Sequence, residues 1–72
     1  MNDHEAEDPD DAIRARLAVA LQEHADLDVA VHSLSMAAMP DMMVIGRLKR
    51  KKLALKDEIA QLKELLTPDI IA

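Results

Sequence analysis

Apolar residues recur along this chain at alternating spacings of three and four residues, in two series that a proline separates. The first series runs over residues 13–34 and the second over residues 45–66. Such spacing brings side chains onto one face of an α-helix, where they form the seam of a coiled coil. The predicted interaction seam consists of Ile13, Leu17, Ala20, His24, Leu27, Val31, Leu34, Ile45, Leu48, Lys52, Leu55, Ile59, Leu62 and Leu66.

Signals for helix ends place the boundaries of two helices. Asp8 can cap the free N–H groups of a helix, and Pro9 suits the first helical position because its missing N–H is not needed there. Pro40 would cost about 3 kcal/mol inside a helix, so it fits better as the first residue of a second helix, with Asp41 in the first turn. Pro68 cannot continue that helix. The predicted elements are a helix over residues 9–38, a turn at 39–40 and a helix over 40–66.

Two helices with a short connection fold back on each other at a low loop-closure cost. We therefore predict an all-α fold, an antiparallel two-helix hairpin of the coiled-coil type over residues 9–66. The two seams keep one heptad phase across Pro40, which leaves open a single long kinked helix in a parallel coiled coil. Residues 1–8 are expected to be a disordered acidic tail, and residues 67–72 a short C-terminal tail.

A second apolar stripe on the first helix predicts association between chains. It lies off the seam and consists of Ala18, Leu21, Ala25, Val29, His32 and Met36. A short chain buries a small fraction of its surface, and without cysteine it has no disulfide to compensate. We therefore expect this candidate oligomer face to support a homo-oligomer, a dimer or tetramer packed as a helical bundle, with docking on another protein's helix as a related use.

The charge is distributed unevenly over a chain whose formal net charge is −5. Residues 2–11 carry only acidic charges, whereas Arg47, Lys49, Arg50, Lys51 and Lys52 form a basic run. The basic run is a candidate anion contact, so an alternative function is a small regulator that binds nucleic acid and is modulated by the acidic segment. The lack of aromatic residues for base stacking makes that alternative less favourable.

Pairs of opposite charges are expected across the hairpin. Arg16 would face Glu58, and Glu23 would face Lys51. Asp28 would accept a hydrogen bond from Lys49 or from Lys52, whose long stem can lie along Leu27 while its ammonium group reaches the carboxylate. A lone polar residue in a seam, such as Lys52, often fixes register and partner number. 

The sequence carries no recognisable catalytic machinery, and we expect a non-enzymatic protein without a cofactor. There is no cysteine nucleophile or glycine-rich phosphate loop, and a two-helix hairpin is expected to offer no cleft of ligand size. His24, Asp28 and His32 share a helix face at a spacing that could hold a metal ion, but a structural role is preferred. No apolar run approaches about 20 residues and no signal peptide is recognisable, so we expect no membrane contact and a cytoplasmic location.

Three segments resemble a known family. They are His24-x-x-Leu27-Asp28, Pro40-Asp41-x-x-x-Ile45-x-x-Leu48 and Lys49-Arg50-Lys51-Lys52-Leu53-x-Leu55-Lys56-Asp57-Glu58-Ile59-x-x-Leu62. These residues are similar to the YdcH-like family of short bacterial proteins, from about Arg14 to Leu62. The resemblance implies a small coiled-coil protein of uncharacterised function with no established catalytic residues. The acidic extension before Arg14 departs from the family pattern.

Overall fold

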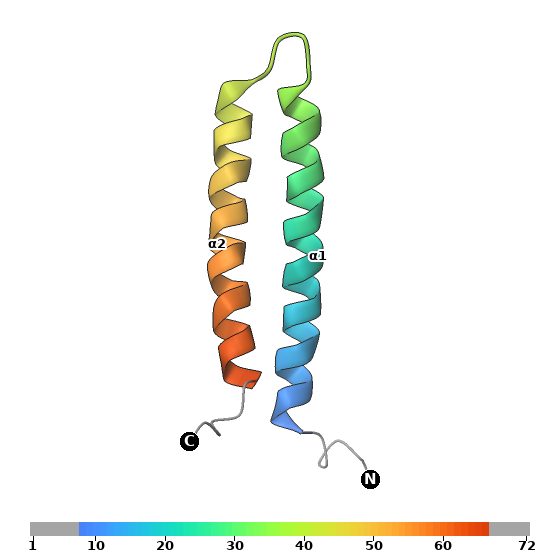
Figure 1. Ribbon diagram of the computed structural model, residues 1–72, viewed down its shortest axis with the longest axis vertical. Coiled ribbons are helices and arrows are strands. Elements are labelled where there is room, and N and C mark those ends of the chain that lie inside the picture. Colours follow the sequence, from blue (N-terminus) through green and yellow to red (C-terminus); the bar gives the residue numbers. More distant parts are fainter. Residues whose placement is uncertain (1–7, 67–72) are drawn as a thin grey trace.

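The computed structural model describes residues 8–66 as two long helices packed antiparallel (Figure 1). Helix α1 spans Pro9–Ser35 and helix α2 spans Met42–Leu66. The predicted all-α hairpin is therefore confirmed, and the single kinked helix is excluded, because the chain reverses direction between the two helices. Neither helix is long and apolar enough to cross a membrane over the described residues. The predicted tails, apart from Asp8, lie outside those residues.

Helix α1 begins as the sequence predicts. The Asp8 side chain accepts a hydrogen bond from the Asp10 backbone N–H at 3.1 Å, and Pro9 takes the first helical position. Asp10 and Asp11 place negative charge at the positive end of the helix dipole. A local cap thus fixes the start of α1 without help from α2.

The turn differs from the prediction at both ends. Helix α1 ends at Ser35 rather than at residue 38, because the Ser35 hydroxyl donates to the Val31 carbonyl and the chain tightens at Met36. Helix α2 begins at Met42 rather than at Pro40. The connection is therefore residues 36–41, and the predicted turn at 39–40 and helix boundaries at 38 and 40 were wrong.

Asp41, and not Pro40, starts the second helix. Its side-chain Oδ1 accepts hydrogen bonds from the Met43 and Val44 N–H groups at 3.1 and 3.2 Å. A carboxylate in this position satisfies N–H groups that have no partner within the helix. Pro40 precedes the cap, at a position where its missing N–H is not needed.

The core is a single row of contacts between the helices. Ala20 is fully buried, and it forms a cluster with Leu55 and Ile59, each 9% exposed. Val31 and Ile45 are buried nearer the turn. A small residue at the most buried position lets the two backbones approach, so the branched side chains of α2 can pack around it. Every residue of the predicted seam is buried or half-buried.

Candidate functional site

The seam divides the surface of the hairpin into two broad faces. On a helix, residues just before a seam residue flank it on one side, and residues just after it flank it on the other. Because the helices are antiparallel, the preceding residues of α1 and α2 share one face of the molecule. We call it the groove face. We call the opposite face the strip face; it runs from the residues just after each seam residue round to Val29 on α1, Met36 at the end of α1 and Asp57 on α2.

An ion pair closes one end of the groove face. The Arg16 guanidinium donates to both carboxylate oxygens of Glu58 at 2.7 and 2.8 Å, which confirms this predicted pair. The hydrogen bond from Arg16 holds the pKa of the Glu58 carboxyl below its usual range. Both residues are substantially exposed, so the pair fixes the register of the helices more than it stabilises them.

We expect a small loss of stability when the pH falls below about 4, the ordinary range of a glutamate carboxyl. Because the folded pKa of Glu58 is lowered, its contribution is complete above the unfolded pKa and disappears as the pH falls through the folded pKa. Arg16→Gln should remove part of this acid-dependent loss in urea unfolding curves. Arg14→Gln is the control, since Arg14 pairs with Asp11 within the same helix. An equal effect of both variants would contradict the assignment.

Lys52 crosses the seam and donates a hydrogen bond to Asp28 at 2.5 Å. This contact decides between the two predicted partners of Asp28 in favour of Lys52 over Lys49. The hydrogen bond from Lys52 lowers the pKa of the Asp28 carboxyl. The Lys52 side chain is 31% exposed, so an ammonium group lies at the margin of the seam, whose other positions on α2 are apolar.

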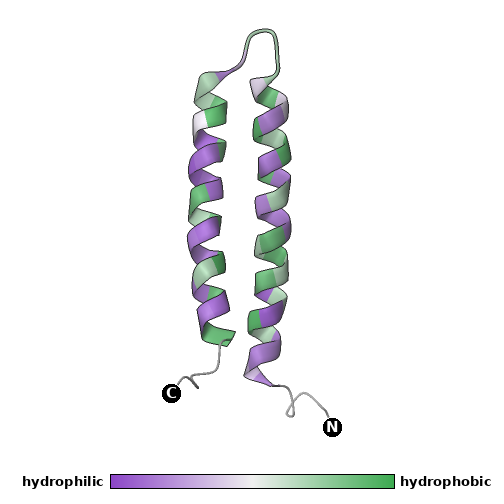
Figure 2. Cartoon of the chain, viewed as in Figure 1, coloured by the Kyte–Doolittle hydropathy of each residue, from purple (hydrophilic) through white to green (hydrophobic). Residues whose placement is uncertain are grey.

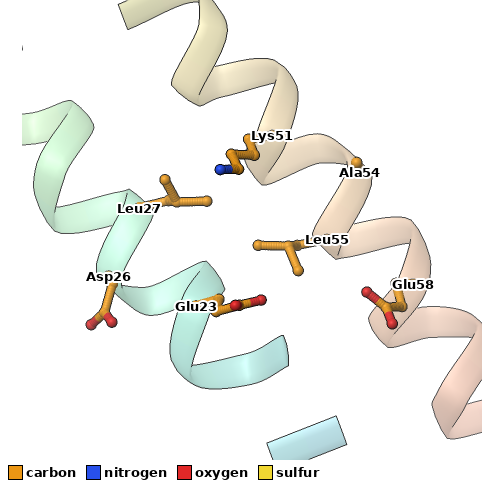
Figure 3. A pocket seen from close by; sticks show the side chains of 7 residues that line it. All are labelled: Glu23, Asp26, Leu27, Lys51, Ala54, Leu55 and Glu58. Atoms are coloured by element: carbon orange, nitrogen blue, oxygen red, sulfur yellow. The ribbon is translucent and has the colours of Figure 1, made fainter. Parts of the chain in front are cut away.

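The groove face contains a groove of about 410 Å³ between the helices (Figure 3). Its lining consists of Glu23, Asp26, Leu27, Lys51, Ala54, Leu55 and Glu58. Figure 3 shows Leu27 and Leu55 pointing toward each other from the two helices. The expectation that the hairpin has no cleft of ligand size was therefore wrong, since ligand pockets start at about 300 Å³.

The sequence-based prediction missed the groove because the groove is marked only by where its residues lie relative to the seam. Each of its lining residues outside the seam immediately precedes a seam residue, as Glu23 precedes His24 and Ala54 precedes Leu55. The predicted facing pair of Glu23 and Lys51 lines opposite walls, but within residues 8–66 these two side chains make no ion pair. The groove has an apolar floor and charged walls, and it can receive a ridge of apolar side chains.

The candidate oligomer face on α1 is exposed. Leu21 is 45% exposed, Val29 66% and Met36 72%. Ala18, Ala25 and His32 are exposed as well. Figure 2 shows hydrophobic segments in green alternating with hydrophilic ones along both helices. Leu53 of α2, which is 59% exposed, extends the apolar surface across the strip face.

The candidate metal and anion sites do not gather into one place. His24 is half-buried in the seam, His32 is exposed, and Asp28 is bound to Lys52. Among the described residues, no group of three or more histidine or acidic side chains could hold a metal ion. The basic run is also dispersed, since Lys51 lines the groove and Lys52 lies in the seam, whereas Arg47, Lys49 and Arg50 are exposed elsewhere around α2.

The connection presents a cluster of exposed methionines. Met36, Met39, Met42 and Met43 are between 68% and 88% exposed. None of them packs into the core cluster. They leave the turn apolar on its outer surface.

A family profile described as "Protein of unknown function (DUF465)" matches residues 17–63. The chain belongs to the DUF465 family. The match confirms the resemblance to the YdcH-like proteins, and it covers most of both helices, the turn and the groove. No curated protein and no solved structure matches the chain. The DUF465 assignment thus gives a family whose activity is unknown.

Proposed function

We propose that this DUF465 protein is a non-catalytic association module that pairs with copies of itself through the strip face. The observation that carries this proposal is the exposure of Leu21, Val29 and Leu53, at 45%, 66% and 59%. Large apolar side chains gathered on one face of a soluble domain usually mark a contact surface.

Energetics favour the same conclusion. A single hairpin buries one stripe per helix. Within residues 8–66 the buried apolar residues are Ala20, Val31, Ile45, Leu55 and Ile59. Burial of apolar surface contributes about 25 cal/mol per Å², and small domains depend on additional contacts for a comfortable stability. Packing a second copy on the strip face would bury Leu21 and Val29 of α1 and Leu53 of α2, which the single hairpin leaves exposed.

The nucleic-acid alternative has weaker support. Binding to phosphates requires several basic side chains directed toward one surface. Lys52 is engaged with Asp28, and Lys51 lines the groove together with acidic residues. Arg47, Lys49 and Arg50 are exposed at different positions around α2, so nucleic acid is the less favoured partner. The groove instead adds a second surface suited to a helix of another protein.

Sedimentation velocity over a range of concentrations tests the proposal. We expect the wild-type protein to form a dimer or tetramer and Leu21→Glu with Val29→Glu to be monomeric, because charges on the strip face cannot be desolvated without a partner charge. The matched control is Val19→Glu, since Val19 is 48% exposed but precedes Ala20 and thus lies on the groove face. A wild-type protein that stays monomeric at the highest attainable concentration would overturn the proposal.

A further inference from the structure

We infer that two copies pack strip face to strip face in an antiparallel arrangement, with a two-fold axis over Ala25 of α1 and Leu53 of α2. This inference rests on the proposed self-association and adds its geometry. In a two-fold interface the same patch serves both partners, so each residue before the axis must suit the residue equally far after it. Most of the exposed residues around these two centres meet this condition.

From Ala18 to His32, the exposed stripe of α1 is symmetric about Ala25. Leu21 and Val29 lie four residues before and after it, and Ala18 and His32 lie seven residues before and after it. In an antiparallel pair, Leu21 therefore comes level with the partner's Val29, and the small Ala25 lies opposite its own copy. Large side chains flank a small centre, which is the arrangement that lets two helices approach closely.

The strip face of α2 is symmetric about Leu53. Gly46 and Ala60 lie seven residues before and after it, so two small residues come level with each other across the axis. Lys49 and Asp57 lie four residues before and after it, so an ammonium group meets a carboxylate on each side of the axis. Apolar and charged positions are thus both complementary in this register.

The two centres of symmetry, Ala25 of α1 and Leu53 of α2, lie at about the same level along the folded hairpin. In an antiparallel hairpin, a step back along α1 corresponds to an equal step forward along α2. Counted in this way from the Asp28–Lys52 pair, Ala25 lies level with residue 55, and counted from the Arg16–Glu58 pair it lies level with residue 49. Leu53 lies between these two estimates. One axis perpendicular to the helices can therefore pass over both centres, and the stripes of α1 and α2 can be paired at the same time.

Gly46 supports this register because the single hairpin does not need a glycine there. Its φ is not positive, and an added Cβ would meet only the end of the Arg50 side chain, at an ordinary 3.7 Å. Glycine inside a helix nevertheless lowers stability relative to alanine. Close approach of the partner's Ala60 gives a reason for its presence.

One contact in this arrangement is unfavourable. Arg50 and Lys56 lie three residues before and after Leu53, so these two basic side chains come level across the axis. Both are exposed, and long basic side chains can direct their charged ends into solvent. Salt should therefore screen the repulsion between Arg50 and Lys56, and it should also screen the attraction between Lys49 and Asp57.

Single cysteines introduced into this cysteine-free chain test the axis. Helices packed about 8 Å apart, with Cα atoms about 2.3 Å from each axis, bring residues on a two-fold axis within the range of a disulfide. We expect Ala25→Cys to form covalent dimers rapidly under mild oxidation. Ala60→Cys should not, since the two copies of residue 60 would be about 21 Å apart. A mixture of Gly46→Cys and Ala60→Cys chains should yield the mixed dimer.

Ala54→Cys is the control, because Ala54 is an exposed alanine of the groove face. Linkage of Ala25→Cys no faster than Ala54→Cys, in a protein that sedimentation shows to be associated, would overturn the geometry and leave the proposed function intact. Linkage of Ala60→Cys with itself as fast as Ala25→Cys would point to a parallel pair and also overturn it. A monomeric wild-type protein would remove the proposed function and the inference together.

Discussion

Leu55→Ala is expected to lower the free energy of unfolding by about 2–5 kcal/mol, the range for truncating a buried leucine. Leu55 is 9% exposed and contacts both Ala20 and Ile59 in the core cluster. Leu17, Leu27 and Leu62 pack against this cluster, so the truncation would weaken the apolar contacts between the two helices. A loss of this size would lower the melting temperature by about 10 °C or more in so small a domain.

Thermal and urea unfolding at one protein concentration, followed by circular dichroism, measure this loss. Leu65→Ala is the matched control, because it removes the same atoms from the same helix at a position that is 64% exposed. We expect the control to change the free energy of unfolding by less than about 1 kcal/mol. Equal losses from the two variants would mean that the cluster around Ala20 does not carry the stability of the hairpin.

The hydrophobic spacing predicted both helices and the face that each presents, and the cost of Pro40 inside a helix favoured the hairpin over one long helix. Each seam residue from Ile13 to Leu66 lies at the helix contact or its margin. In larger domains a helix contacts several neighbours and its apolar residues do not reveal which one they face. Here the three-and-four spacing allows one contact per helix, and the proline between the series makes the chain reverse.

The turn could not be predicted to the residue from local signals alone. Pro40 suits the first position of a helix, but it suits the position before a capping residue equally well. Asp41 decides the matter, because its carboxylate bonds the N–H groups of Met43 and Val44. The early end of α1 depends on the Ser35 hydroxyl and on the length of chain needed to reverse direction, which heptad counting does not contain.

The sequence predicted the exposed stripe of α1 but not the groove. The exposed stripe of α1 follows from periodicity, because residues that are apolar but off the seam have no second helix to cover them. The groove depends on how far apart the helix backbones are held, and that distance is set by which side chains meet in the seam. The choice of Lys52 over Lys49 as the partner of Asp28 depends on the same distance.

Lys52→Leu is expected to raise the free energy of unfolding by about 1 kcal/mol, because a leucine at this half-buried position would bury apolar surface without desolvating an ammonium group. The melting temperature should rise by about 4–8 °C. Asp28 loses its partner, but its side chain is 54% exposed and remains hydrated. The seam would then be apolar at every position of α2 from Ile45 to Leu66.

The same substitution should broaden the distribution of oligomers. Lys52 accepts only an arrangement in which its ammonium group reaches Asp28 or solvent, whereas a leucine packs in several registers and partner numbers. Sedimentation velocity should show additional species for Lys52→Leu and an unchanged distribution for Lys51→Leu, which alters the groove wall and leaves the seam intact. If the Lys52→Leu protein is more stable but sediments as one unchanged species, Lys52 lowers stability without selecting the oligomer. The register of the helices would then have to depend on the pair of Arg16 and Glu58.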